Sequence, residues 1–90
     1  MPQTDDSTLH NLGLNLKNAR KRYFPRDDQR RFAARINVSR ATYQKMEKGD
    51  STISLGSYLA AARLFGLEDQ INLLFLPPKE KTDLLKELDL

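Results

Sequence analysis

The chain of 90 residues contains no cysteine and only one histidine. Without cysteine it can form neither a disulfide nor a zinc site built on thiolates. His10 has no partner residue beside it in the sequence, so neither a metal site nor a catalytic base is predicted there. Stability must therefore come from the packing of one modest core, or from a partner chain.

Long apolar runs are also missing. No run approaches the roughly 18 residues that a membrane-spanning helix needs, and the polar, acidic start "MPQTDDSTLH" does not resemble a signal peptide. The sequence shows no nucleophile–base pair, no phosphate-binding glycine loop and no metal-ligand cluster. We therefore expect a cytoplasmic protein that is not an enzyme and binds no cofactor.

Positive charge is concentrated in the middle of the chain. The net charge is only +3, yet residues 12–48 carry eleven Lys or Arg against three acidic residues, a local net charge of +8. The flanking segments 1–11 and 49–90 have net charges of −2 and −3. This distribution favours a surface that faces a polyanion, while a solvated charged helix face remains the alternative.

The spacing of apolar residues predicts an all-α protein. In the first helix they recur in steps of three and four at Leu9, Leu12, Leu16, Ala19 and Tyr23, which places them on one face that ends before Pro25. Further helices are predicted over residues 29–36, 40–48, 55–65 and 68–76. The expected organisation is a disordered segment 1–8, a domain 9–76 of five helices, and a tail 77–90 in which a short sixth helix is left open.

The inner faces of the later helices follow from the same spacing. Phe32, Ala33 and Ile36 should face inward from one helix, and Tyr43 and Met46 from the next. The inner face expected for the helix 55–65 consists of Leu55, Leu59, Ala62 and Phe65.

Residues 28–39 have the local chemistry of a helix-turn-helix. Asp28 and Ser39 are suited to cap the two helices at their N-termini. Ala33 supplies a small side chain where the helices cross. Asn37 tolerates the left-handed backbone of a tight turn, and Val38 follows as an apolar plug.

The whole stretch "QRRFAARINVSRATYQKMEKG", residues 29–49, resembles the helix-turn-helix of the Cro and phage-repressor family, also called the XRE family. The resemblance extends over about residues 12–75 and implies a phage-repressor-like fold in a bacterial, nucleoid-associated DNA-binding protein. Asn37 replaces the glycine that is common in this turn. The loop between the first two helices is about two residues longer than usual.

The resemblance implies roles in DNA binding for individual residues. Contacts to base edges are expected from Ser39, Arg40, Ala41, Gln44 and Lys45. Contacts to phosphates are expected from Gln29, Arg30, Thr42 and Lys48. Arg40 is chemically suited to O6 and N7 of guanine, and Ala41 to a thymine methyl group. Arg30, with Arg31 and Arg35, could instead only solvate a helix face.

Glu47 is an acidic residue on a helix expected to face DNA. In proteins that the chain resembles, this glutamate forms a partly buried ion pair with an arginine of the first helix, for which Arg20 is the best candidate here. Its expected role is therefore structural.

The function implied by the resemblance is a repressor that binds an inverted-repeat operator as a homodimer. Five apolar residues beyond the motif are the candidate dimer interface: Leu67, Ile71, Leu74, Phe75 and Leu76. The segments "EKGD" and "SLG" also resemble HipB-type antitoxins, which partner HipA-type kinase toxins. The alternative is a protein-interaction module that has the fold but does not bind DNA.

Overall fold

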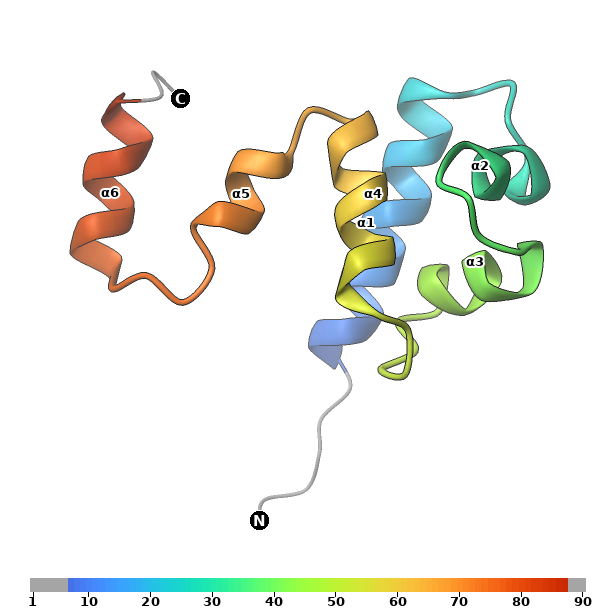
Figure 1. Cartoon of the computed structure of the whole chain (residues 1–90), viewed down its shortest axis with the longest axis horizontal. Coiled ribbons are helices and arrows are strands. Elements are labelled where there is room, and N and C mark those ends of the chain that lie inside the picture. The colour runs from blue at the N-terminus through green and yellow to red at the C-terminus, as the bar shows by residue number, and fades with distance from the viewer. Residues whose placement is uncertain (1–6, 88–90) are drawn as a thin grey trace, which may run out of the picture.

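The computed structural model describes residues 7–87, apart from the side chains of residues 82, 83 and 85–87. Within this range it contains six helices and no strand, so the predicted all-α fold is confirmed (Figure 1). The helices are α1 (Ser7–Tyr23), α2 (Gln29–Arg35), α3 (Arg40–Glu47), α4 (Leu55–Leu64), α5 (Glu68–Asn72) and α6 (Pro78–Glu87). Residues 1–6 of the predicted disordered segment lie outside the description. In the part described, no helix combines the length and the apolar character that crossing a membrane requires.

The two capping residues predicted for the helix-turn-helix are confirmed. The carboxylate of Asp28 accepts a hydrogen bond of 2.8 Å from the backbone N–H of Arg31 at the start of α2. The hydroxyl of Ser39 accepts one of 3.0 Å from the backbone N–H of Thr42 at the start of α3. Both side chains satisfy an N–H group that has no partner within its own helix.

The turn between α2 and α3 also has the predicted conformation. Asn37 has a φ of 59°, in the left-handed region. The next residue, Val38, packs against the core, and its N–H donates to the carbonyl of Ala33 at 3.1 Å. A turn of this kind sets the angle between the two helices, so α3 has a fixed orientation relative to α2.

Aromatic rings form the centre of the core. Phe32 of α2 and Tyr43 of α3 are fully buried, with ring centroids 5.1 Å apart. Phe65, at the end of α4, stacks on Phe32 at 5.5 Å, and Phe24 from the loop after α1 meets the same ring edge-on. These contacts connect four segments of the chain through one phenylalanine.

The predicted inner face of α1 is partly wrong. The buried residues of this helix are Gly13, Leu16 and Arg20, whereas Leu12 is exposed and Tyr23 is 60% exposed. The helix is rotated from the predicted stripe towards its glycine and its arginine. Periodicity of apolar residues could not show this, because one of the residues that face inward has no side chain and another is charged.

Two glycines bring α1 and the end of α3 into backbone contact. A Cβ atom on Gly13 would lie only 2.4 Å from the carbonyl oxygen of Glu47. Gly49, which follows α3 with a φ of 76°, would place a Cβ 2.2 Å from the carbonyl oxygen of Leu9. No residue larger than glycine fits either position without a shift of backbone, since the obstructing atoms belong to main chain.

The prediction for α4 also needs a correction. Leu55 was expected to face inward but is exposed, and the buried residue of the helix is the small Ala61. Leu59, Ala62 and Phe65 are half-buried. Because Leu55 is the first residue of the helix, it lies beyond the edge of the core that Ala61 contacts.

α5 is shorter than predicted. It ends at Asn72 instead of residue 76, and Leu73 that follows is buried. Phe75 has a φ of 70°, which a right-handed helix cannot contain. The helix α6 then begins at Pro78, directly after Pro77. Proline is tolerated at this position because the first turn of a helix needs no N–H donor.

The contact at Gly13 is testable by substitution. We expect Gly13→Ala to lower the free energy of unfolding by about 1–3 kcal/mol, because the added methyl group forces two backbones apart. Gly56→Ala is the matched control, since its Cβ would meet nothing closer than the Ser54 hydroxyl at 3.8 Å. This control should be neutral or stabilising by up to about 1 kcal/mol. Urea denaturation of both variants measures the difference, and equal stabilities would contradict the close approach.

Candidate nucleic-acid interface

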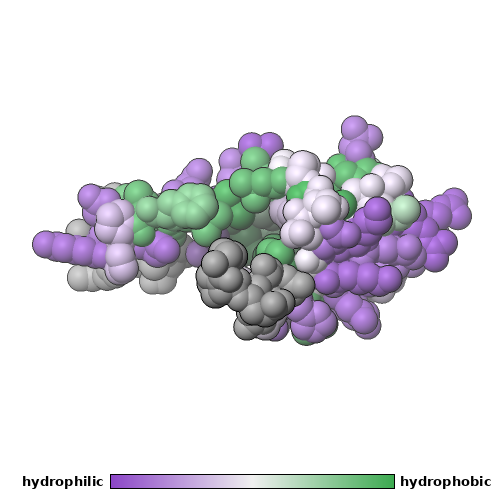
Figure 2. All heavy atoms as spheres, turned by 90° about the horizontal axis from the view of Figure 1, so that it is seen from below, coloured by the Kyte–Doolittle hydropathy of each residue, from purple (hydrophilic) through white to green (hydrophobic). Residues whose placement is uncertain are grey.

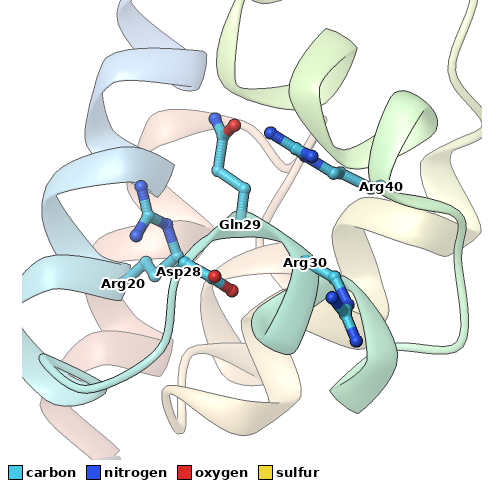
Figure 3. Close-up of a pocket in the computed structure, with 5 residues that line it drawn as sticks. All are labelled: Arg20, Asp28, Gln29, Arg30 and Arg40. Carbon is cyan, nitrogen blue, oxygen red and sulfur yellow. The ribbon is translucent and has the colours of Figure 1, made fainter.

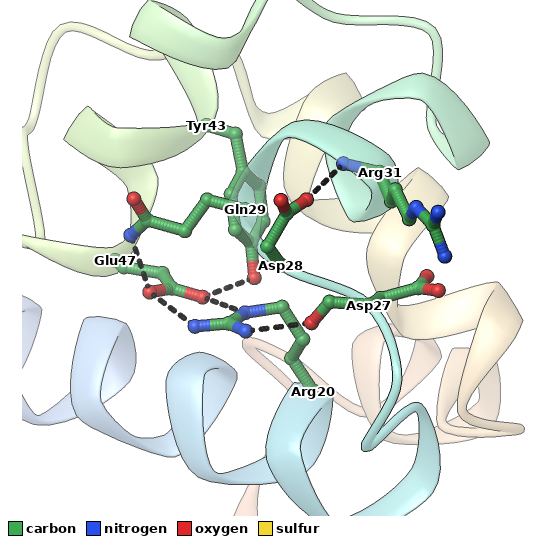
Figure 4. Close-up of polar contacts among 7 residues, drawn as sticks. All are labelled: Arg20, Asp27, Asp28, Gln29, Arg31, Tyr43 and Glu47. Carbon is green, nitrogen blue, oxygen red and sulfur yellow. Dashed lines mark hydrogen bonds and ion pairs between the residues drawn. The ribbon is translucent and has the colours of Figure 1, made fainter.

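The carboxylate of Glu47 accepts hydrogen bonds from residues of three helices (Figure 4). Nε of Arg20, from α1, donates to Oε2 at 2.8 Å, and Nη2 donates to Oε1 at 3.3 Å. Nε2 of Gln29, from α2, donates to Oε1 at 2.9 Å. The hydroxyl of Tyr43, one turn earlier on α3, donates to Oε2. We call these four residues the Glu47 network.

The charges of the network are buried and compensated. The side chains of Arg20 and Glu47 are only 9% and 4% exposed. Burial alone would raise the pKa of Glu47, but hydrogen bonds from Arg20, Tyr43 and Gln29 together lower it below its ordinary value. Burial and the bond to Glu47 raise the pKa of Tyr43. The carboxylate is therefore ionised and the phenol neutral at physiological pH, so the charge of Arg20 is balanced inside the protein.

A second ion pair fixes the loop between α1 and α2. Arg35 donates from Nε and Nη2 to the two carboxylate oxygens of Asp27, and its guanidinium lies 4.6 Å from the ring centroid of Phe24. This hydrogen bonding lowers the pKa of Asp27. The carbonyl of Asp27 in turn accepts from Nη1 of Arg20 at 3.0 Å. Arg35 is thus engaged within the protein, and its positive charge has a structural partner.

A polar hollow of about 320 Å³ lies beside the Glu47 network (Figure 3). The residues that line it are Arg20, Asp28, Gln29, Arg30 and Arg40. The amide of Gln29 has a defined orientation there, since its nitrogen donates to Glu47. Figure 3 shows the amide oxygen on the side of Arg40. The network therefore determines which polar atom of Gln29 faces the first residue of α3.

The face of α3 opposite the buried residues Tyr43, Met46 and Glu47 is turned to solvent. Of the residues predicted to contact DNA from this helix and its ends, Ser39, Arg40, Ala41, Lys45 and Lys48 are exposed and Thr42 and Gln44 are half-buried. Among the described residues, the side chains of Arg40 and Gln44 have no hydrogen-bond or ion-pair partner. Ser39 differs, because its hydroxyl also donates to Thr42 Oγ1 at 3.0 Å and is already occupied by capping.

The residues predicted for a dimer interface lie at the other end of the molecule. Leu67 and Ile71 border or belong to α5, and Leu74, Phe75 and Leu76 are on the connection to α6. Leu67 and Leu74 are exposed, Ile71 and Leu76 half-buried, and Phe75 is 97% exposed. Figure 1 shows α5 and α3 on different sides of α1 and α4. These residues are therefore separated from the solvent-facing side of α3.

Sequence reasoning missed two members of the network. Tyr43 was expected only to fill the core, and Gln29 only to contact a phosphate. A signal for Tyr43 exists, since it stands four residues before Glu47 and so shares its helix face. No comparable signal exists for Gln29, because its contact with Glu47 depends on the angle between α2 and α3.

Comparison with known families agrees with this geometry. A family model described as Helix-turn-helix, which represents domains of the XRE type, matches residues 27–70. The match begins just before α2 and ends within α5, so it includes both helices of the motif. No curated protein and no solved structure gives a significant match to the chain. The fold is thus that of a helix-turn-helix domain, and the match indicates a DNA-binding transcriptional regulator.

The structural role of Glu47 can be separated from a role in DNA reading. We expect Glu47→Ala to lower the free energy of unfolding by about 3–5 kcal/mol, because it leaves Arg20 buried without its counter-charge. The ratio of affinities for a preferred and a non-preferred DNA sequence should stay unchanged, measured below the lowered melting temperature.

Glu68→Ala is the matched control for this substitution. Glu68 pairs with Arg63 at 3.2 Å, but both side chains are about half exposed. Its removal should cost no more than about 1 kcal/mol. A melting temperature of Glu47→Ala equal to that of the parent would contradict the structural role.

Proposed function

We propose that the protein is a transcriptional repressor that binds an inverted-repeat operator as a homodimer. The observation that carries this proposal is the contrast between the two faces of α3. Its inner face is fixed by the burial of Tyr43 and Met46 and by the Glu47 network. Its outer face presents the side chains of Arg40 and Gln44, which have no partner within the part of the chain that the structure describes, together with the exposed Lys45.

Such an outer face suits the major groove of DNA. A recognition helix enters this groove, and its first residues meet the edges of the bases. Arg40 is the first residue of α3, and a guanidinium can donate two parallel hydrogen bonds to O6 and N7 of guanine. We assign to Arg40 and Lys45 the main base contacts, with Gln44 beside them and Ala41 against a thymine methyl group. Ser39, which caps the N-terminus of α3, is assigned to the same group of base contacts.

The phosphate contacts follow from charge and position. Arg30 lines the same hollow as Gln29, so a phosphate oxygen that approaches Gln29 lies near a positive charge. Gln29 still has a second amide hydrogen, because only one is used by Glu47. Thr42 and Lys48 are assigned to phosphates beside the ends of α3. These contacts position the helix and carry no sequence information themselves.

Dimerisation is proposed because one helix reads too few base pairs for specificity. A two-fold dimer places its recognition helices about 34 Å apart, in successive major grooves on one side of the DNA. The apolar residues Leu67, Ile71, Leu74, Phe75 and Leu76 support this arrangement. They leave the outer face of α3 free, and exposed apolar residues that follow one another, such as Leu74 and Phe75, are typical of an interaction site when they form part of a larger patch.

A narrower version of the proposal is a HipB-type antitoxin that binds a HipA-type kinase. It is supported by the resemblance of "EKGD" and "SLG" in the sequence. Expression of this chain with the product of the neighbouring gene distinguishes it. Co-purification with a kinase-like protein supports the antitoxin role, and a neighbour of another kind leaves the general repressor.

Binding to DNA is tested by salt-titrated gel shift with genomic fragments. We expect specific retardation that weakens steeply as salt rises, because bound phosphates release counterions. Arg40→Ala should lower the affinity for the preferred fragment by about 1–3 kcal/mol and reduce discrimination. Lys48→Ala should weaken binding to all fragments alike and lower the salt slope by about one.

Lys79→Ala is the control for loss of a positive charge. Lys79 is exposed on α6, away from α3 (Figure 1), so its removal should leave discrimination between fragments intact. Absence of any retardation at low salt would favour a protein-interaction module instead. A monomer that protects a single non-palindromic half-site would count against the dimer.

A further inference from the structure

The residue that follows the glycine at the end of α3 is an aspartate, Asp50. Gly49 adopts a φ of 76°, and its N–H donates to the carbonyl of Met46 at 3.0 Å. The N–H of Asp50 donates to the carbonyl of Lys45, also at 3.0 Å. These two bonds form a turn that commonly ends a helix at a glycine. The backbone of Asp50 is therefore held against the last turn of α3.

The side chain of Asp50 also has a defined orientation. Its Oδ1 accepts hydrogen bonds from the backbone N–H of Thr52 at 2.8 Å and from the Thr52 hydroxyl at 2.6 Å. Its second carboxylate oxygen accepts no hydrogen bond from the described residues. The hydroxyl of Tyr58, on α4, donates to the backbone carbonyl of Asp50 at 3.3 Å. The loop between α3 and α4 thus holds one carboxylate in a fixed place.

The charge of Asp50 is not compensated by an ion pair. Two other acidic residues near α3, Asp27 and Glu47, are buried and bound to arginines. Asp50 forms no ion pair with any described residue, and its hydrogen-bond donor Thr52 is neutral. The hydrogen bonds from Thr52, together with the nearby charge of Lys45, lower the pKa of Asp50. Its carboxylate is therefore ionised at physiological pH.

This negative charge lies beside residues to which we assign DNA contacts. Lys45, assigned to base edges, accepts the backbone hydrogen bond from Asp50, and Lys48, assigned to phosphates, precedes Asp50 by two residues. Both lysine side chains are exposed. Figure 2 shows hydrophilic side chains over much of the end of the molecule that contains α2 and α3. A fixed carboxylate thus stands at the edge of a surface that is expected to attract phosphates.

We propose that Asp50 is a specificity-determining residue that weakens binding to DNA without the operator sequence. This inference rests on the proposed DNA-binding function and extends it to a residue outside α3. Specificity can come from repulsion of the wrong partner as well as from attraction of the right one. A carboxylate without a counter-charge repels any phosphate that comes within about one Debye length, roughly 8–10 Å at physiological salt.

The repulsion acts more strongly on non-specific complexes than on the operator complex. Non-specific binding depends almost entirely on the attraction between cations and phosphates, and the protein slides through many positions along the duplex. In positions where a phosphate approaches the loop after α3, Asp50 opposes the attraction of Lys45 and Lys48. The operator complex has a single register, and its hydrogen bonds to bases do not depend on the charge of this loop. Asp50 therefore lowers the non-specific affinity by the larger factor.

Asp50→Asn separates the charge from the turn. Asparagine can accept the same two hydrogen bonds from Thr52 and is equally suited to a turn of this kind, but it has no charge. The melting temperature of this variant should remain close to that of the parent, which checks that the loop is intact. If Asp50 served only to form the turn, the variant would bind DNA as the parent does.

Affinities are measured by gel shift for the preferred genomic fragment and for an unrelated duplex of equal length, at low and at high salt. We expect Asp50→Asn to raise the affinity for the unrelated duplex by about threefold to tenfold at low salt, and the affinity for the preferred fragment by a smaller factor. The ratio of the two affinities therefore falls. The change should shrink as salt rises, because exposed charges are screened.

Glu80→Gln is the matched control, since it also replaces one carboxylate with an amide. Glu80 is exposed in the first turn of α6, away from α3 (Figure 1). Its substitution changes the net charge of the protein by the same amount as Asp50→Asn, and it should leave the ratio of affinities unchanged. A similar fall in the ratio with Glu80→Gln would overturn the inference, because net charge alone would then account for the effect.

Three results with Asp50→Asn would also overturn the inference. Unchanged affinities for both duplexes would leave Asp50 with the turn alone. An equal rise for both would mean that its charge adds no specificity. A loss of affinity for the preferred fragment only would mean that Asp50 accepts a hydrogen bond from a base such as cytosine. In each case the parent still binds DNA, whereas a parent that binds neither duplex at low salt would overturn the proposed function itself.

Discussion

The carboxylate of Glu47 is buried at the point where the first three helices meet. It connects the first three helices, since its hydrogen bonds come from Arg20, Gln29 and its own helix neighbour Tyr43. A carboxylate in this position needs bonds that offset the cost of burial, and the hydrogen bonds from Arg20, Tyr43 and Gln29 favour its ionised form by lowering its pKa. These hydrogen bonds fix the position of α3 relative to α1 and α2.

Other features of the fold are linked to the ion pair between Arg20 and Glu47. For Arg20 to reach Glu47, α1 has to present its arginine inward and approach the end of α3 closely. Gly13 permits this approach, because a side chain there would collide with the backbone of Glu47. The network also orients the amide of Gln29 beside Arg40. The buried charge of Glu47 thus determines how the amide of Gln29 is oriented beside the first residue of α3.

The basic residues of the central segment divide into two groups by their partners. Arg20 and Arg35 are bound to Glu47 and Asp27 and serve the fold. Arg40 has no such partner in the part of the chain that the structure describes and is exposed. The net charge of the segment therefore overstates the charge that a DNA phosphate would meet. Only a free guanidinium can exchange its solvation for a contact to DNA.

Local chemistry made much of the fold predictable from the sequence. Helix capping and turn formation depend only on neighbouring residues in the sequence. The caps Asp28 and Ser39 and the turn residue Asn37 could therefore be assigned without knowledge of the tertiary structure. The family resemblance supplied the pairing of Arg20 with Glu47, which spacing alone could not give. The contacts expected with DNA remain predictions.

What the sequence could not show depends on three-dimensional packing. The rotation of α1 follows from a glycine and an arginine that apolar periodicity ignores. The early end of α5 follows from the left-handed conformation of Phe75, which its residue type does not favour. The orientation of the Gln29 amide depends on the relative position of α2 and α3, because Gln29 donates from one helix to Glu47 on the other.

Selection of binding sites from random DNA by the purified protein tests whether α3 reads DNA. We expect enrichment of an inverted repeat whose half-sites are about one helical turn apart. The same selection with Arg40→Ala should change the preference at one corresponding position in each half-site. Failure to enrich any sequence at low salt, or enrichment that Arg40→Ala leaves unaltered, would contradict the assignment of α3 as the helix that reads DNA.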